Sequence, residues 1–100
     1  MRNCVSTRKV TVLNPQGLHA RPAYQFAKLA GRFQAAVEVI KEDQHANGKS
    51  ILDLLMLAAE AGTELLVVAR GEDASEATEA LGQLMEQMVS LEKIQGLEPE

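Results

Sequence analysis

GLHARPA, residues 17–23, sets the position of the first helix and, with it, the order of the fold. Pro22 has no backbone N–H to donate, so it is tolerated in the first turn of a helix and not further along. The helix therefore begins close to His19, which takes the N-cap position or the one beside it. Gly17 permits backbone conformations that other residues avoid. We expect a break at Gly17 that leads directly into a helix.

The start of this helix also favours anions. The N–H groups of a first turn have no partner within the helix, and the positive end of the helix dipole adds to their attraction. Arg21 contributes a permanent cation whose planar fork suits phosphate oxygens. The same field disfavours a protonated imidazole at His19, so we expect a neutral, nucleophilic ring near neutral pH. Such a ring can accept a phosphoryl group and pass it on, because the P–N bond is labile.

The local residues also have a simpler interpretation. A histidine before a helix is often only a weak cap, and Arg21 can be a solvated surface charge. Helix N-termini attract anions by default, and most of them carry no chemistry. Residues 17–23 alone leave both interpretations open.

Outward from these residues, strands and helices alternate. Short β-branched or apolar runs bounded by turn residues predict strands at 9–13, 35–41, 44–47 and 63–70. Apolar residues at helical spacing predict helices from His19 to about Phe33, from Ser50 to about Ala59, and from about Asp73 past Val89. The order β-α-β-β-α-β-α indicates an α+β fold, with helices covering one face of a mostly antiparallel sheet. We expect the tail from about Gly96 to fray.

Composition excludes several classes of function. The chain has 100 residues, which suggests one domain, and it is 46% hydrophobic and 24% charged. A net charge of −4 argues against nucleic acid as a partner. No apolar run approaches the ~20 residues of a membrane span, and the first residues are too polar for a signal peptide. We expect a cytoplasmic protein without an internal disulfide, because Cys4 is the only cysteine.

The predicted helix from Ser50 carries more apolar side chains than a small core can bury. They lie nearly all round the helix, so some should be exposed and contact a partner. Ser50 and Asp53 resemble a capping box, and so do Asp73 and Glu76. Ser50 has two interpretations, a helix cap and a phosphorylation site, because added charge is tolerated at a helix N-terminus.

Other candidate sites are weaker. We expect His45 to be solvent-exposed in an edge strand, because no second ligand lies at metal spacing. Cys4 has no basic or histidine partner in pattern, so we assign it no reactivity. Gly48-Lys49-Ser50 imitates the end of a phosphate-binding loop, but the first glycine is missing. We predict no metal site and no cofactor.

Two motifs together resemble one family. The run at 17–23 resembles the active-site motif of HPr, the histidine-containing phosphocarrier of the bacterial phosphoenolpyruvate:sugar phosphotransferase system. Residues 47–52, Asn-Gly-Lys-Ser-Ile-Leu, resemble the family's second motif, around its regulatory serine. The resemblance covers roughly residues 7–90 of a single domain, 1–100, and leaves a C-terminal extension at 91–100. It implies the HPr-like open-faced β-sandwich.

The resemblance implies a carrier rather than a free-standing enzyme. Enzyme I, charged by phosphoenolpyruvate, would phosphorylate Nδ1 of His19, and an A domain of enzyme II would receive the group. Arg21 matches the arginine that steadies the phosphoryl group. In many members an HPr kinase/phosphorylase modifies the serine that matches Ser50. The family's docking face, on the first two helices, implies these contact residues here: Ala20, Tyr24, Lys28, Lys49, Ile51, Leu52 and Leu55.

Some features depart from the family pattern. Asp53 stands where members often carry glycine, and its charge would oppose a phosphate at Ser50. The turn at Glu42-Asp43 lacks the Asn-Gly of some members. Gly48-Lys49 favours the sugar-type pathway, with a nitrogen-type regulatory protein as the alternative. We expect a monomer.

Overall fold

The computed structural model describes residues 4–97, and side chains for residues 4–88. The elements follow the predicted order: β1 Val5–Thr11, α1 Ala20–Ala30, β2 Ala36–Lys41, β3 Gln44–Asn47, α2 Ile51–Met56, β4 Glu64–Arg70 and α3 Ala74–Leu97.

The four strands form one sheet with the order β1-β4-β2-β3. Every pair of neighbouring strands is antiparallel. Strand β4 lies between β1 and β2, so the order of the strands in the sheet differs from their order in the chain. Val67 of β4 is a register partner of both Arg8 in β1 and Val39 in β2. This register places side chains from three strands side by side on each face of the sheet.

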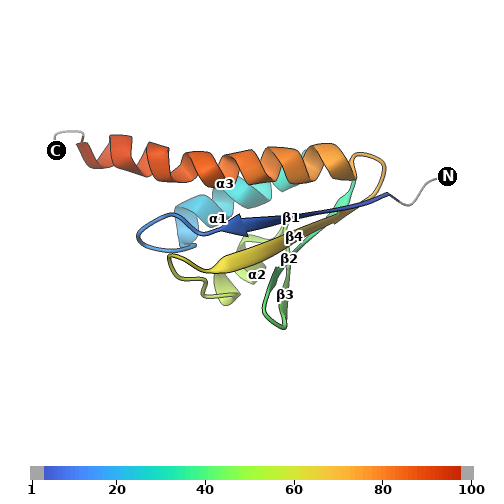
Figure 1. Cartoon of the computed structure of the whole chain (residues 1–100), viewed down its shortest axis with the longest axis horizontal. Coiled ribbons are helices and arrows are strands. Elements are labelled where there is room, and N and C mark those ends of the chain that lie inside the picture. Colours follow the sequence, from blue (N-terminus) through green and yellow to red (C-terminus); the bar gives the residue numbers. More distant parts are fainter. Residues whose placement is uncertain (1–3, 98–100) are drawn as a thin grey trace.

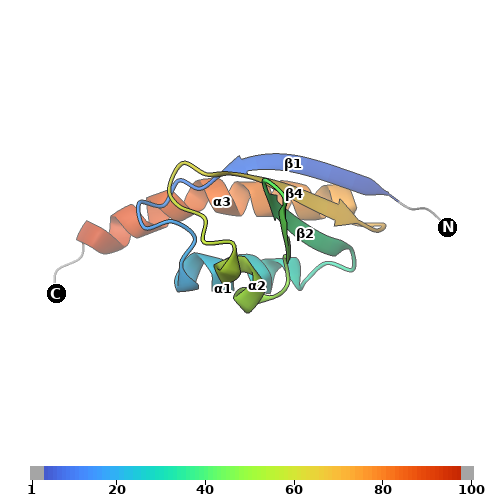
Figure 2. The same cartoon turned by 90° about the horizontal axis from the view of Figure 1, so that it is seen from below.

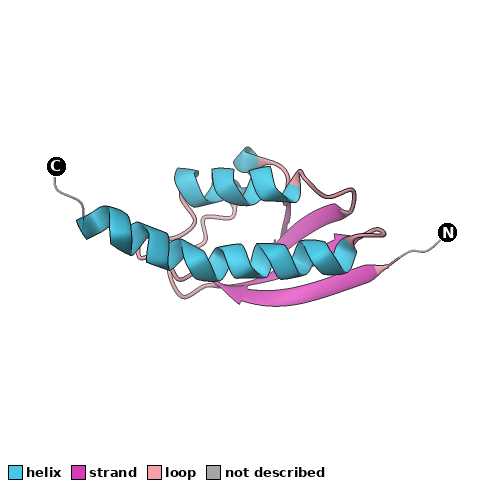
Figure 3. Cartoon of the chain, turned by 90° about the horizontal axis from the view of Figure 1, so that it is seen from above, coloured by secondary structure: helices cyan, strands magenta, loops and turns pink. Residues whose placement is uncertain are grey.

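The helices cover one face, as predicted. Figure 1 shows α3 lying along β1 with α1 beside it, and Figure 3 shows both helices over the strands. The short helix α2 packs against α1 and β3 (Figure 2). The opposite face carries no helix among the described residues, which gives the open-faced sandwich.

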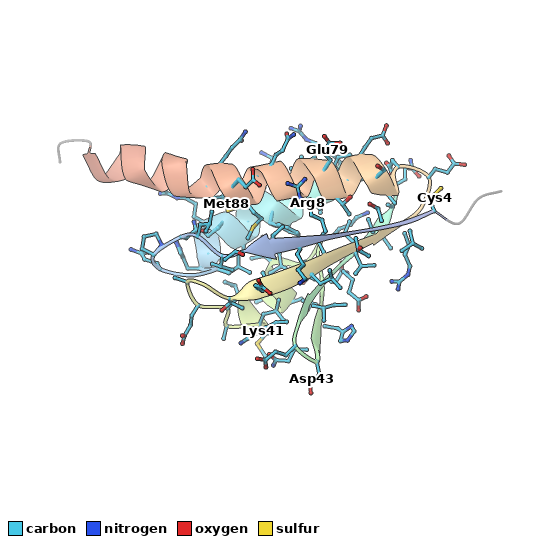
Figure 4. The ribbon with its side chains drawn as sticks, in the orientation of Figure 1. Cys4, Arg8, Lys41, Asp43, Glu79 and Met88 are labelled. Atoms are coloured by element: carbon cyan, nitrogen blue, oxygen red, sulfur yellow. The ribbon has the colours of Figure 1, made fainter. Side chains whose placement is uncertain are left out.

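The core lies between the sheet and the helices. It is aliphatic and alanine-rich, as the scarcity of aromatic residues requires. Its helical members repeat every three or four residues: Ala23, Phe26, Ala27 and Ala30 in α1, and Ala74, Ala77, Leu81, Met85 and Met88 in α3. Arg8 rises from β1 toward α3, where it pairs with Glu86 at 3.3 Å and occupies the space that Gly82 leaves (Figure 4). Apolar residues on one side of each helix therefore hold α1 and α3 against the sheet.

Several predicted boundaries were wrong. β1 spans Val5–Thr11 rather than 9–13, because it pairs along the whole length of β4. Helix α1 ends at Ala30, where Gly31 is the C-cap, so Phe33 lies outside it. Helix α2 ends at Met56, and Ala58 then adopts φ 51° and turns the chain well before Gly62.

Helix α3 extends beyond the run of apolar residues, Ala74 to Met88, from which it was predicted. It continues to Leu97, because Gln, Leu, Met, Glu and Lys, which are strong helix formers, make up most of the stretch after Leu81 and outweigh Gly82 and Gly96. Gly96 and Leu97 are therefore helical, and the rest of the predicted frayed tail, residues 98–100, lies outside the described residues.

Asp73 joins the start of α3 to the loop before β2. Its two carboxylate oxygens accept hydrogen bonds from the N–H groups of Gln34, at 2.9 Å, and Ala35, at 2.8 Å. The bond from Gln34 does most to hold the pKa of Asp73 below its usual range. Asp73, which the sequence predicts as a helix cap, therefore also holds residues 34 and 35 in the loop before β2.

Asp73→Ala should destabilise the protein in a pH-dependent way. The lowered pKa means that this stabilisation is present above the ordinary pKa of aspartate and is lost as the pH falls through the lowered value. Urea unfolding should show the variant less stable than the wild type at neutral pH, with the difference shrinking in acid. Glu72→Ala, at an exposed neighbour, is the control. A difference that is independent of pH would contradict a role for the carboxylate.

Candidate functional site

His19 is the N-cap of α1. Its backbone is extended, with φ −93° and ψ −166°, and its carbonyl accepts the N–H of Ala23 at 3.0 Å. The imidazole does not cap the helix, because no side-chain cap bond forms. His19 therefore occupies the cap position without a side-chain cap bond, which is compatible with both interpretations of residues 17–23, the weak cap and the anion site.

A tight turn holds His19 in place. Gly17 adopts φ 77°, a left-handed conformation that favours glycine. The N–H of Leu18 donates to the carbonyl of Ala59 at 2.9 Å, and the Leu18 side chain is buried. This hydrogen bond and the buried Leu18 side chain join the loop before α1 to the loop after α2. His19 is therefore positioned by segments from two parts of the chain.

The half-buried His19 lines a hollow of about 560 Å³ between these two loops. Pro15, Gln16 and Leu18 form one wall, and residues 58–61 form the other. Pro22 is buried in the first turn, as expected for a residue that fixes the start of the helix. The ring can thus be reached from solvent while the loops hold its backbone.

The charges of the first turn suit an anion. No acidic residue lies in the first turn of α1, and Arg21 is exposed there. An anion at this turn would meet its N–H groups and the positive end of the helix dipole, with no acidic side chain in the turn to repel it. The anion site at residues 17–23 stays a prediction.

Gly17→Ala should destabilise the protein by about 2–4 kcal/mol, because it adds a steric clash to the cost of a left-handed backbone. A Cβ at Gly17 would lie 2.6 Å from the carbonyl oxygen of Ala59. Gly62→Ala is the matched control, because Gly62 has φ 90° but nothing within 4 Å of an added Cβ. It should cost only about 1–2 kcal/mol. Equal losses in chemical denaturation would show that contact with Ala59 is unimportant.

Ser50 is the N-cap of α2, as predicted. Its Oγ accepts the N–H of Asp53 at 3.2 Å. Asp53 does not complete the expected reciprocal bond to Ser50; its carboxylate accepts the N–H of Asn47 at 3.1 Å. Residues 47–52 therefore form a turn at the start of α2. The Ser50 hydroxyl and the Asp53 carboxylate each accept a backbone N–H that stabilises this turn.

Exposed apolar side chains lie on α2. The exposed fractions are 73% for Leu52, 77% for Met56 and 37% for Ile51. Leu54 is buried and Leu55 half-buried, so the predicted division of this helix between core and surface is confirmed. Met56 is the surface residue that the sequence analysis missed; it lies one turn after Leu52 and therefore on the same exposed face of α2.

Helix α1 adds polar and aromatic groups beside this surface. Ala20 and Tyr24 are exposed, and the Nζ of Lys28 lies 5.7 Å from the Tyr24 ring centre, within range of a cation–π contact. Because α1 packs against α2, these groups and the exposed residues of α2 belong to neighbouring helices (Figure 2). Lys49 donates to the carbonyl of Phe33 at 2.8 Å.

The weaker candidates have simple outcomes. His45 is exposed as predicted, and its Nδ1 lies 2.5 Å from a carboxylate oxygen of Glu38, a partner that the sequence did not indicate. Cys4 is exposed. Among residues 4–88, whose side chains are described, there is no cluster of three or more metal-ligating side chains. Within residues 4–97, no helix is both long and apolar enough to cross a membrane.

Comparison with known proteins identifies the class. The family model for PTS-HPr, described as the PTS HPr component phosphorylation site, matches residues 6–87. Phosphocarrier protein HPr of Lysinibacillus sphaericus is 42% identical over 84 residues, which cover 84% of this chain and 96% of that protein. Phosphocarrier protein NPr of Shewanella violacea is 37% identical over 79 residues, or 79% and 87% of the two chains.

Solved structures agree with the sequence matches. The histidine-containing phosphocarrier protein of a mycoplasma superposes with a TM-score of 0.81 at 33% identity and covers 84% of this chain and 96% of its own. An HPr dimer from Thermoanaerobacter tengcongensis gives 0.65 at 34% identity, over 80% and 92% of the two chains. Fold and matches together make this protein a phosphocarrier of the phosphotransferase system. The chain belongs to the HPr family.

Proposed function

We propose that His19 accepts a phosphoryl group from phosphoenolpyruvate-charged enzyme I and passes it to enzyme II A domains in sugar uptake. The observation that carries this proposal is the position of His19, which is the N-cap of α1 and lines an open hollow, beside a first turn that holds Arg21 but no acidic residue. Membership of the HPr family supports the same role.

The transfer forms one bond and breaks one. The Nδ1 lone pair of His19 attacks phosphorus, and the bond from phosphorus to the donor group of enzyme I breaks. Delivery to the A domain reverses these roles, so no oxidant or reductant takes part. N–H groups at the start of α1 and the Arg21 fork stabilise the charge on the phosphoryl oxygens in both directions.

Reconstitution tests the complete route. The protein is incubated with labelled phosphoenolpyruvate and enzyme I, and an A domain is then added. We expect an acid-labile label on this protein that decreases as the A domain becomes labelled. A label that forms but never leaves would exclude the carrier role, although His19 would still be an acceptor.

The docking face comprises Ala20, Tyr24, Lys28, Lys49, Ile51, Leu52 and Leu55, together with Met56. Its exposed apolar residues on α2 would bury area against a partner, and the basic residues on its border would attract acidic partners despite the overall negative charge. We propose that both enzyme I and the A domain bind here, because the face lies on the two helices nearest the phosphoryl site.

Ser50 is proposed as a regulatory phosphorylation site for an HPr kinase/phosphorylase. Negative charge at Ser50 would lie beside the docking face and oppose acidic partners. Ser50→Asp should therefore slow phosphorylation by enzyme I by about tenfold, a loss of the size that repulsive rim charges produce. Ser75→Asp, an exposed first-turn position of α3, is the matched control. Equal rates for the two variants would contradict the regulatory proposal.

The alternative function is a nitrogen-type regulatory protein that acts through phosphorylation-dependent binding. The similarity to NPr supports it. Pull-downs with the unmodified and phosphorylated protein separate the two roles. Partners that bind only one form would favour regulation, whereas capture of A domains irrespective of form would favour transport.

We further propose a cytoplasmic monomer, because a phosphoryl carrier must release one partner to meet the next. Light scattering at working concentrations tests this against the dimer known for a relative. A stable dimer would contradict the monomer.

A further inference from the structure

A second hollow, of about 560 Å³, lies at the edge of the sheet away from His19. It is bounded by the start of β2, by β3 and the turn that follows it, and by the end of β4. Its polar and charged lining residues are Gln34, Glu38, His45, Asn47, Lys49 and Arg70. Neither His19 nor Ser50 lines it, although Lys49, which precedes Ser50 and belongs to the proposed docking face, does.

The turn after β3 builds one wall of this hollow. The N–H of Gly48 donates to the carbonyl of Val37 at 2.7 Å, and a Cβ at Gly48 would lie 2.5 Å from the Val37 side chain. Only glycine lets the turn lie this close to β2. As a result, Asn47 and Lys49, on either side of Gly48, both border the hollow.

Most of the lining side chains are hydrogen-bond donors. The side-chain oxygen of the exposed Asn47 accepts the N–H of Lys49 at 2.9 Å, which leaves the NH₂ group of Asn47 as a donor. Lys49 uses one ammonium donor on the carbonyl of Phe33. Arg70 lies 3.5 Å from Glu38 through one nitrogen, and a guanidinium carries five N–H donors.

The acidic residue of the hollow is already engaged. One carboxylate oxygen of Glu38 faces His45 and the other faces Arg70. These contacts, led by the hydrogen bond with His45, hold the pKa of Glu38 below its usual range. Among the lining residues, Arg70 and Lys49 carry two positive charges against the one negative charge of Glu38, and the Asp73 carboxylate outside the lining also interacts with Lys49. The lining itself therefore keeps an excess of positive charge and of donors.

We propose that this hollow binds a small phosphate ester. The Arg70 fork would bind two phosphate oxygens, and the Lys49 ammonium and the Asn47 amide would bind the remainder. The exposed Ala36 provides apolar surface for the carbon part, and the volume lies within the range of small-molecule sites. The proposal does not depend on phosphoryl transfer at His19.

Backbone amide NMR tests this site with defined probes. Phenyl phosphate, inorganic phosphate, benzoate and phenol are titrated separately into the full chain. We expect saturable shifts at residues 36–38, 45–49 and 70, tightest with phenyl phosphate, weaker with inorganic phosphate and benzoate, and absent with phenol.

Variants of Arg70 separate the site from general charge effects. Arg70→Gln should weaken phenyl phosphate binding by about tenfold, since a charge-assisted pair is lost. Arg70→Lys keeps the charge but not the fork, so it should fall between Arg70→Gln and the wild type. Arg32 is an exposed arginine just beyond the end of α1, and the Arg32→Gln variant should bind phenyl phosphate like the wild type.

Three results would overturn the proposal. Shifts confined to residues 18–23 would mean that anions bind only at the start of α1. Equal affinity for benzoate and phenyl phosphate would remove the preference for phosphate. Equal weakening in the Arg70→Gln and Arg32→Gln variants would reduce the effect to net charge. Phosphorylation by enzyme I, measured on the same samples, reports separately on the proposed function.

Discussion

His19→Ala should abolish phosphorylation by enzyme I, with a loss on the order of 10³-fold or more in initial rate. The imidazole supplies the nucleophile, and the arginine and helix N–H groups around it can stabilise a phosphoryl group but cannot accept one. The variant should fold normally, because the backbone of residue 19, which alanine keeps, makes the hydrogen bonds to Gly17 and Ala23 at the start of α1. Labelling with phosphoenolpyruvate and enzyme I measures the rate, and circular dichroism checks the fold.

His45→Ala is the matched control, because it removes the other histidine of the chain. His45 lies in β3 and pairs with Glu38, away from the start of α1. It should be labelled at the wild-type rate. Labelling of the His19→Ala variant at the wild-type rate would show that the acceptor lies elsewhere.

Arg21→Ala should slow phosphorylation by about 10- to 100-fold while leaving the fold intact. A charge-assisted, bidentate contact to the phosphoryl oxygens is worth this much when it acts on the transition state. The stability change should be below about 1 kcal/mol, because the side chain is exposed. Rapid-quench kinetics with enzyme I measure the rate, and urea unfolding measures the stability.

Arg32→Ala removes a second exposed arginine, beyond the end of α1, and should leave the rate unchanged. If both variants slow the reaction equally, steering by net charge explains the effect. If Arg21→Ala unfolds the protein, Arg21 supports the fold and its assignment to the phosphoryl group is wrong.

Local rules predicted the elements of this fold well. The missing N–H of Pro22 placed the start of α1, and Ser50 placed the start of α2. Both signals act within one helical turn, so the sequence carries them directly. The polar first half of β1 was missed, because it becomes a strand only by pairing with the apolar β4.

Contacts between distant segments could not be read from the sequence. Asp73 carries a helix-start signature, yet it also binds N–H groups 38 and 39 residues away. The group of Glu38, His45 and Arg70 comes from three strands, and only the register of the sheet brings it together. The hollow beside it was therefore unpredictable from spacing, although Gly48 and Lys49 had been singled out as a motif.

The most direct test of the central claim is the position of the phosphoryl group in the wild-type protein. The chain is labelled with ¹⁵N-histidine, phosphorylated with phosphoenolpyruvate and enzyme I, and observed by phosphorus and nitrogen NMR. We predict one phosphohistidine, with phosphorus coupled to Nδ1 of His19 and the His45 signals unchanged. Coupling to a His45 nitrogen, or no phosphohistidine when enzyme I is active on a known carrier, would contradict it.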